Sequence, residues 1–273
     1  MTRAQRIARV GLVTADPGNA EAFFRDALGF QRIGVEERAE GTRATVLRLG
    51  REVIELLAFA RPGRPYPPDS RSFDLWFQHF AIVVSNMRDA YTRLGATTGW
   101  TPISTDGPQH LPASSGGVTA FKFRDPEGHP LELLEFPPDK VPPAWQGLRH
   151  EGPCLGIDHS AIAVADTAAS VGFYKQFGFE VAARSLNRGV EQERLDNAPG
   201  AVVEVTALAL PDAPGPHLEL LAYRHPVGRP APPMDESDVA RTRLVLEVAR
   251  GSADPSPATV RDPDGHELVL AGS

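Results

Sequence analysis

Two stretches decide the fold, QHFAIVV (78–84) and DHSAIAV (158–164), each of which opens a short apolar run with a histidine. Runs of this length, rich in valine, isoleucine and alanine and bounded by polar residues, are typical of buried β-strands. The same position in two further runs, ARVGLVT and TRLVLEV, holds Arg9 and Arg243. This recurrence predicts four copies of one structural unit, and only the two inner copies begin their first strand with an imidazole.

The segments that follow each first strand support the repeat. In unit 1, PGNAEAFFRDALGF (17–30) spaces its apolar residues for a helix that ends at Gly29, and two β-type runs follow. Unit 3 repeats this order through TAASVGFYKQFGF and PHLELLAY, and unit 2 through NMRDAYTRLG, GVTAFKF and PLELLEF. Unit 4 is truncated, because its connector ARGSADPSP (249–257) contains prolines that exclude a helix.

Proline-rich linkers separate the units and set the expected boundaries. The predicted modules are 6–60, 75–137, 155–224 and 240–271. In chain order they form a first pair within 1–140 and a second pair within 154–273. The predicted fold class is therefore α+β, with four βαβββ modules of which the last lacks its helix.

Composition excludes several classes of function. The 273 residues carry a formal net charge of −7 without a basic stripe, which argues against a nucleic-acid binder. No apolar run approaches the roughly 20 residues of a membrane span, and the N-terminus lacks the apolar core of a signal peptide. The single cysteine, Cys154, is expected to be passive. We expect a cytoplasmic protein, monomeric or homodimeric, that binds a small molecule.

A tandem βαβββ unit with a histidine in its first strand, DPxGH before its last strand and ELL within it resembles the vicinal oxygen chelate superfamily. That family includes glyoxalase I, bleomycin-resistance proteins, epimerases and extradiol dioxygenases. The resemblance covers residues 6–271. It implies that two modules join their sheets into an incomplete barrel of mixed β-sheet, flanked by helices, so that four modules form two such barrels. It also implies a divalent metal in the cleft of a barrel, with at most two ligands from each module.

The resemblance assigns these ligand positions to the first and last strand of each unit. Units 2 and 3 offer a full set of donors, His79, Glu132, His159 and Glu219. Units 1 and 4 offer Arg9, Glu55, Arg243 and Val269, the last aligned through its Gly-His pair. Arginine supplies no lone pair and cannot ligate a metal.

Two pairings of the units are open. If neighbours pair, as in the dioxygenases, each cleft receives one arginine and is damaged. If unit 2 pairs with unit 3 and unit 1 with unit 4, as in tandem glyoxalase I, one cleft holds two imidazoles and two carboxylates and the other is metal-free. We favour the second arrangement.

Two imidazole nitrogens and two carboxylate oxygens suit a borderline divalent ion such as Ni, Co, Zn, Fe or Mn. A substrate with two adjacent oxygens can chelate that ion, and the resemblance implies that Glu132 or Glu219 shuttles a proton. The favoured function is a metal-dependent lyase or isomerase acting on a small oxygenated metabolite. The rivals are an extradiol Fe(II) dioxygenase with a two-histidine, one-glutamate triad and a metal-free binding protein of the bleomycin-resistance type.

Weaker candidates for substrate contact come from stretches that line the pocket in relatives. They are Asn187, Gln192, Arg194, Phe121 and Phe123. Arg194 is expected either to hold an anionic tail or to pair with a neighbouring glutamate on a solvated strand. His129 and His266, which follow DPEG and DPDG turns, are expected to be structural, and His217 is placed in a loop without a role.

Overall fold

The structure, a computed structural model, describes residues 3–148, 150–211, 213, 215–249 and 258–272. Unit 1 comprises β1 (Ala4–Val13), α1 (Pro17–Leu28), β2 (Gln31–Glu37), β3 (Arg43–Leu49) and β4 (Glu52–Ala58). Unit 2 comprises β5 (Gln78–Val84), α2 (Met87–Gly95), β6 (Thr101–Pro102), β7 (Gln109–His110), β8 (Thr119–Arg124) and β9 (Pro130–Glu135). Unit 3 comprises β10 (Cys154–Ala163), α3 (Thr167–Lys175), β11 (Glu180–Arg188), α4 (Val190–Asp196), β12 (Val202–Ala209) and β13 (His217–His225). Unit 4 comprises β14 (Arg243–Val248), β15 (Ala258–Arg261) and β16 (Glu267–Gly272).

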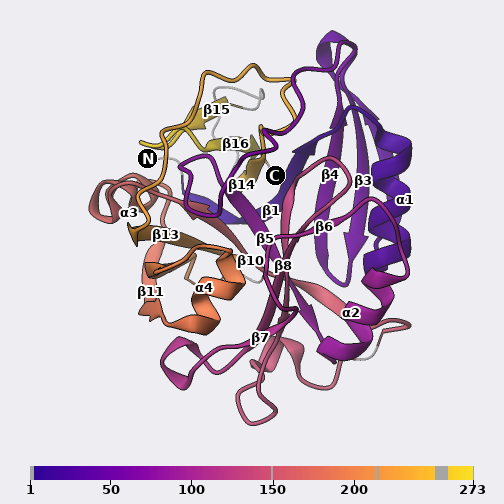
Figure 1. Cartoon of the computed structure of the whole chain (residues 1–273). Coiled ribbons are helices and arrows are strands. Elements are labelled where there is room, and N and C mark those ends of the chain that lie inside the picture. Colours follow the sequence, from indigo (N-terminus) through magenta and orange to yellow (C-terminus); the bar gives the residue numbers. More distant parts are fainter. Residues whose placement is uncertain (1–2, 149, 212, 214, 250–257, 273) are drawn as a thin grey trace.

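The strands form two open mixed sheets (Figure 1). One sheet has the order β15-β16-β14-β1-β4-β3-β2, and the other has the order β11-β12-β13-β10-β5-β9-β8-β6 with β7 beside β8. The first strands of the paired units run antiparallel, β1 against β14 and β5 against β10. Unit 1 therefore shares a sheet with unit 4, and unit 2 with unit 3, which confirms the pairing that the ligand positions favoured. Neither sheet closes on itself, which agrees with the predicted incomplete barrels.

In all four units the first strand pairs in parallel with the last strand, and the register of this pairing is the same. The equivalent partners are Gly11 and Glu55, Ala81 and Glu132, Ala161 and Glu219, and Val245 and Val269. Val269 thus occupies the same position as Glu132 and Glu219, which confirms the alignment through the Gly-His pair. The two sheets can be compared residue by residue.

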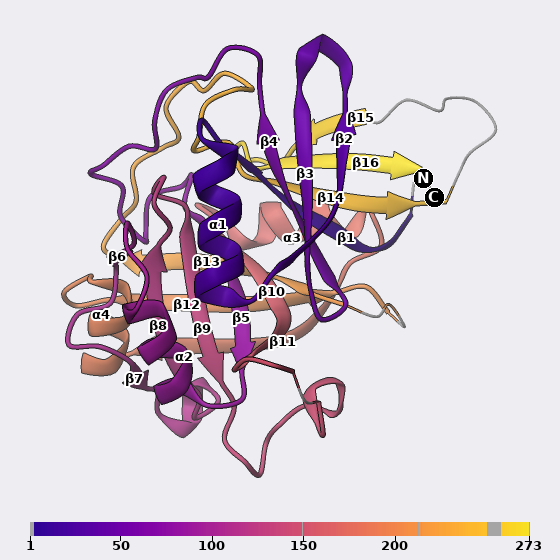
Figure 2. The same cartoon turned by 90° about the vertical axis from the view of Figure 1, so that its right-hand side faces the viewer.

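Side-chain alternation along the inner strands separates the core from the site. In β5, Phe80 and Ile82 belong to the main hydrophobic core, whereas His79 and Ala81 face the other side of the sheet. Helices α1 and α2 lie on one side of the molecule and α3 on the opposite side (Figures 1 and 2). The Phe24 ring of α1 stacks on Phe80 with centroids 6.4 Å apart, so this helix joins unit 1 to the sheet of unit 2.

The DPxGH turns fasten one sheet to the other. His129 Nδ1 donates to the Asp125 carboxylate at 2.8 Å, and its Nε2 lies 3.0 Å from the Val13 carbonyl oxygen in unit 1. His266 of unit 4 makes the matching contact to the Ala163 carbonyl oxygen in unit 3 at 2.9 Å. Both histidines are therefore structural, as the sequence predicted.

Two expectations for the connections differ from the structure. The stretch expected as a solvated strand is helix α4, which begins after Gly189 (φ 103°) and ends at the left-handed Asn197 (φ 49°). Residues 250–257 of the predicted helix-free connector in unit 4 lie outside the described residues. Within the part of the chain that the structure describes, no helix is both long enough and apolar enough to cross a membrane.

Candidate metal centre

Three side chains from three adjacent strands of the inner sheet converge at one point. They are His79 on β5, Glu132 on β9 and His159 on β10, and each offers one ligand atom such that all three atoms lie within 4.8 Å of one another. His79 Nε2 lies 2.8 Å from Glu132 Oε2, and His159 Nε2 lies 3.8 Å from the same oxygen. All three side chains are buried, so their donor atoms face each other rather than solvent.

Glu219, the fourth predicted ligand, approaches this cluster from the side of β13. Its Oε2 lies 3.6 Å from His159 Nε2, but it is not among the three residues that meet the 4.8 Å condition. The structure thus brings two histidines and one glutamate into a tight cluster and leaves the second glutamate at its edge. A group in this place can ligate an ion or remain free to exchange a proton.

His159 is held in one orientation by its neighbour in sequence. Its Nδ1 donates to Asp158 Oδ2 at 3.0 Å, and the other oxygen of this carboxylate accepts from Trp145 Nε1 at 3.2 Å. With Nδ1 occupied, Nε2 is the atom that faces Glu132 and Glu219. His79 lacks such a support, because its buried Nδ1 has no hydrogen-bond partner among the described residues.

His217, which the sequence analysis placed in a loop, belongs to the site. It is the first residue of β13 and stands two residues before Glu219, so both side chains face the same side of the sheet. Its Nε2 lies 3.5 Å from Glu219 Oε1, and its Nδ1 lies 3.8 Å from Asp158 Oδ2. The period of two around Glu219 would have identified it.

The two histidines of the cluster differ in charge. Burial lowers the pKa of His79, with a further contribution from the nearby Lys122 ammonium, so this imidazole is neutral and retains a lone pair. For His159, burial is outweighed by the Glu219, Asp158 and Glu132 carboxylates, which raise its pKa to about 9. Without a bound cation, a proton on His159 therefore compensates the surrounding negative charge.

The glutamates stay ionised for the corresponding reason. Burial alone would raise the pKa of Glu132, but Lys122 and the hydrogen bond to His79 hold it below the usual range. Burial is likewise outweighed at Glu219, where the charge of His159 and the contact with His217 lower the pKa to about 2. Ionised carboxylates beside imidazoles form the donor set that borderline divalent ions prefer.

A buried ammonium group, that of Lys122, lies beside the cluster in the lining of the same cavity. Lys122 lies directly across from Glu132 in the β8–β9 pair, and its Nζ donates to Asp196 Oδ1 at 2.7 Å. Asp196 also accepts from Gln192 Nε2 at 2.6 Å and from the Tyr223 hydroxyl at 2.8 Å. This network fixes helix α4 over the sheet and holds a positive charge at the cavity wall.

These residues enclose a cavity of about 290 Å³, at the lower limit of the size range of small-ligand sites. The lower end of that range matches a metabolite rather than a large cofactor. Two weaker candidates, Asn187 and Gln192, line this cavity, together with apolar side chains such as Leu134 and Val203. The inner cleft, as we call this cavity, therefore combines charged donors at one end with an apolar wall.

The other weak candidates lie elsewhere. Phe121 and Phe123 are fully buried in the main core, because on β8 they alternate with Lys122 and therefore face away from the cavity. Arg194 Nε pairs with the exposed carboxylate of Asp106 at 3.3 Å, outside the cavity. None of the three lines the inner cleft, and the residue of β8 that reaches it is Lys122.

The equivalent positions in the sheet of units 1 and 4 form what we call the outer cleft. Glu55, whose side chain is only 1% exposed, is bound by Arg9 at 3.2 Å and by Arg38 at 2.6 Å. Arg243 pairs with Glu267 at 3.3 Å, and Gly11 leaves room for it, since a Cβ there would lie 2.7 Å from the arginine Cγ. Guanidinium groups take the place of the imidazoles, and they neutralise the carboxylates with fixed positive charge.

Comparison with known proteins agrees with this architecture. The model of the Glyoxalase/Bleomycin resistance protein/Dioxygenase superfamily matches residues 6–133 and 156–270. The chain therefore belongs to this superfamily. No curated protein matches the sequence.

Solved structures with the same fold include glyoxalase I from Zea mays, at 14% identity and a TM-score of 0.61 over 100% of this chain and 92% of that one. A glyoxalase I mutant from Zea mays gives 14% identity and a TM-score of 0.63 over 99% and 94%. A "putative dioxygenase" from Bacillus subtilis gives 12% identity and 0.61 over 100% and 86%. At these identities the likeness establishes the fold, and the reaction must be argued from the site.

Proposed function

We propose that this protein is a metal-dependent lyase or isomerase that acts on a small metabolite with oxygen atoms on two adjacent carbons. The observation that carries the proposal is the convergence of His79, Glu132 and His159 from three strands within 4.8 Å. The donor set fits a divalent ion of the Ni, Co, Zn, Fe or Mn type, since it offers two imidazole nitrogens and ionised carboxylates. An ion bound there would supply Lewis-acid polarisation of a substrate oxygen.

Glu219 is the residue we assign to proton transfer. Glu132 is held between the two histidines, whereas Glu219 contacts His159 only at the edge of the cluster and faces the cavity. An ionised carboxylate in this place can remove a proton from the carbon next to a carbonyl and return it to the neighbouring carbon. A positioned carboxylate of this kind contributes about 10² to 10⁴ in rate.

The rest of the inner cleft supports the same chemistry. Lys122 places a positive charge close to Glu132, where it can stabilise negative charge that develops on a substrate oxygen. Leu134, Val203 and Leu221 give the same cavity an apolar wall. A compact, oxygen-rich metabolite with a short carbon skeleton fits this combination.

A second candidate function is a ring-cleaving dioxygenase. The tight cluster contains two histidines and one glutamate, which is the composition of the facial triad that binds Fe(II) in oxygenases. Under this alternative Glu219 would not act as a base, and His79, His159 and Glu132 would hold an Fe(II) ion that supplies oxygen chemistry for the cleavage of a catechol.

The test starts with metal analysis of protein purified without chelators, followed by two assays. In the first, the protein is loaded with Ni²⁺ or Zn²⁺ and incubated with dihydroxyacetone in D₂O, and proton exchange is followed by nuclear magnetic resonance. In the second, protein loaded anaerobically with Fe²⁺ receives catechol and oxygen uptake is recorded. Exchange without oxygen uptake supports the lyase or isomerase, and oxygen uptake alone supports the dioxygenase. Absence of a bound ion contradicts both and favours a metal-free binding protein.

A further inference from the structure

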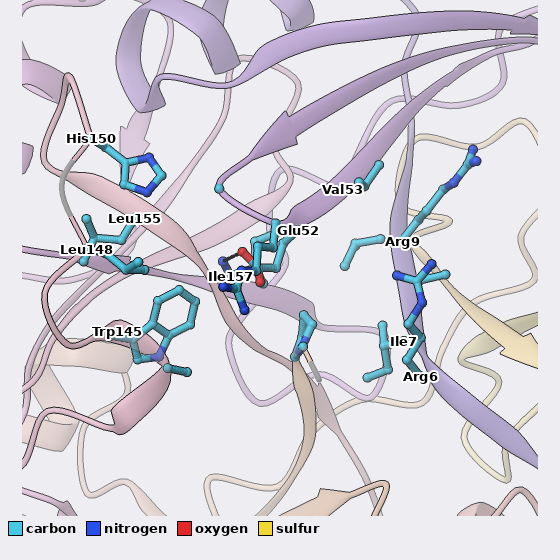
Figure 3. Close-up of a pocket in the computed structure, with 17 residues that line it drawn as sticks. Arg6, Ile7, Arg9, Glu52, Val53, Trp145, Leu148, His150, Leu155 and Ile157 are labelled. Atoms are coloured by element: carbon cyan, nitrogen blue, oxygen red, sulfur yellow. Dashed lines mark hydrogen bonds between the residues drawn. The ribbon is translucent and has the colours of Figure 1, made fainter. Parts of the chain in front are cut away.

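A larger cavity, of about 630 Å³, lies between the two sheets and is separate from the inner cleft. It is bounded by β1, by the β3–β4 turn, by the linker before β10 and by β10 itself. We call it the intersheet pocket. Figure 3 shows Arg6, Ile7 and Arg9 on one wall and Trp145, Leu148 and Leu155 on the opposite wall, with Glu52 and Ile157 between them.

Two glycines let the walls of the pocket approach each other closely. A Cβ on Gly156 would lie 2.7 Å from the Trp145 ring and 2.2 Å from a Glu52 oxygen. A Cβ on Gly50 would lie 2.4 Å from the Leu155 carbonyl oxygen. The indole and the β3–β4 turn can therefore approach strand β10 closely and frame the space.

The charge of the lining is opposite to that of the chain. Arg6, Arg9 and Arg51 line the pocket, whereas Glu52 is the only acidic residue among the described residues of the lining, in a protein of net charge −7. Glu52 is buried, and its Oε2 accepts from the Ile157 amide at 3.4 Å, so it does not oppose an anion at the mouth. Arg51 is exposed in the turn and forms no ion pair with the described residues.

Arg51 is the arginine of this lining whose donors are available for a ligand. Arg9 pairs with Glu36 and Glu55, with its side chain directed away from Trp145 (Figure 3), and Arg6 pairs with Glu247 on the partly exposed rim. Behind them the surface is apolar, and Leu148 exposes 37% of its area in the absence of a partner. A guanidinium rim around an apolar wall is complementary to an amphipathic carboxylate.

We propose that the intersheet pocket is a second ligand site, which binds a monoanion made of an apolar body and one carboxylate group. The carboxylate meets Arg51 in the β3–β4 turn, and the apolar body lies against Trp145, Leu155 and Ile157. This site does not depend on the function assigned to the inner cleft.

The test uses octanoate as the probe and octan-1-ol as its uncharged match, with isothermal titration calorimetry for affinity. Trp145 fluorescence reports the location, because Trp145 is the tryptophan in this lining. We expect one octanoate per chain, hexanoate about tenfold weaker because two methylenes are lost, and octanol at least about fivefold weaker because the ion pair is lost. Trp145→Phe should retain binding and lose the fluorescence change.

Three variants test whether octanoate binds in the intersheet pocket or in the inner cleft. Arg51→Glu, in an exposed turn, should weaken octanoate at least about fivefold and leave octanol unchanged. Val53→Trp should fill the pocket and abolish both, and Lys122→Gln, in the inner cleft, should leave octanoate affinity unchanged. The proposal is overturned if octanoate does not saturate at millimolar concentration, if octanol binds equally well, or if Lys122→Gln rather than Arg51→Glu weakens binding. If Val53→Trp does not fold, Arg51→Glu still decides.

Discussion

The inner and outer clefts are built from equivalent strands in the same register, and their side chains differ at three of the four ligand positions, since Glu55 keeps the glutamate. In the inner cleft these are His79, Glu132, His159 and Glu219, and in the outer cleft Arg9, Glu55, Arg243 and Val269. A guanidinium group carries a permanent charge and fixes its carboxylate partner, whereas an imidazole can exchange its proton for a metal ion. One scaffold thus supports a structural ion-pair network on one sheet and a candidate reactive centre on the other.

Converting one cleft toward the other gives the largest expected effect. His159→Arg places in the inner cleft the residue that Arg243 provides in the outer cleft. Because the guanidinium supplies no lone pair and brings positive charge beside Glu132 and Glu219, we expect Ni²⁺ affinity to fall about 1,000-fold or more. Competition with a chelator of known affinity measures this. Arg243→Lys should leave the affinity unchanged, and an equal loss in both variants would contradict the assignment of the two clefts.

The two inner glutamates are expected to have different roles, Glu219 as a base and Glu132 as a metal ligand. Glu219→Gln should lower turnover about 10² to 10⁴-fold, because the base is lost, while metal affinity changes by less than about tenfold. Glu132→Gln should lower metal affinity itself, because it removes the central carboxylate of the cluster. Measuring both quantities on each variant separates ligand from base. Equal loss of metal in the two variants would show that Glu219 is a ligand only.

The clefts should also differ in their response to pH. The folded pKa of His159 is about 9, above its ordinary value of 6.5, because of the surrounding carboxylates. A group with a raised folded pKa stabilises the protein fully below its unfolded pKa and loses that contribution as pH rises through the folded value. In metal-free protein we expect the free energy of unfolding to fall by about 3 kcal/mol between pH 6.5 and 9, as measured by urea denaturation.

His159→Gln should flatten this profile, because glutamine does not titrate. The arginines of the outer cleft stay charged across the same range and contribute no slope. A slope that persists in His159→Gln would show that other groups are responsible.

Weakening the hydrogen bond that orients His159 should have a smaller effect on metal affinity. Asp158→Asn weakens the hydrogen bond that orients the ring, so metal affinity should fall about 10 to 100-fold, as for other residues that hold metal ligands. The matched control is Asp125→Asn, which alters the same type of contact on the structural His129. That control should leave metal affinity unchanged, and an equal loss would assign the effect to general destabilisation.

Much of the architecture was readable from the sequence because it is repeated. The four units and the equivalence of Val269 with the two inner glutamates followed from one pattern of strands and Gly-His turns, and the pairing of 2 with 3 was favoured because only the inner units carry a full set of metal donors. The repeat supplies an internal alignment, and arginine at a ligand position excludes a metal on chemical grounds alone.

The remaining features depend on tertiary contacts. Helix α4 is a single short segment whose residues Gln192 and Asp196 are fixed by Lys122 and Tyr223, and such contacts leave no periodic signal. The facing of β8 was decided by the pairing of Lys122 with Glu132, which sent Phe121 and Phe123 into the core. His217 is a different case. It stands two residues before Glu219, so the strand period of two already predicts that both side chains face the same side of the sheet.

The central claim is that an ion binds where the inner strands meet and not at the equivalent place in the outer sheet. The most direct measurement is anomalous diffraction at the metal edge from crystals grown with Ni²⁺. We expect one strong peak per chain, in contact with His79 Nε2, His159 Nε2 and Glu132. A peak beside Arg9 and Arg243, or none between the two inner histidines at saturating Ni²⁺, would contradict it.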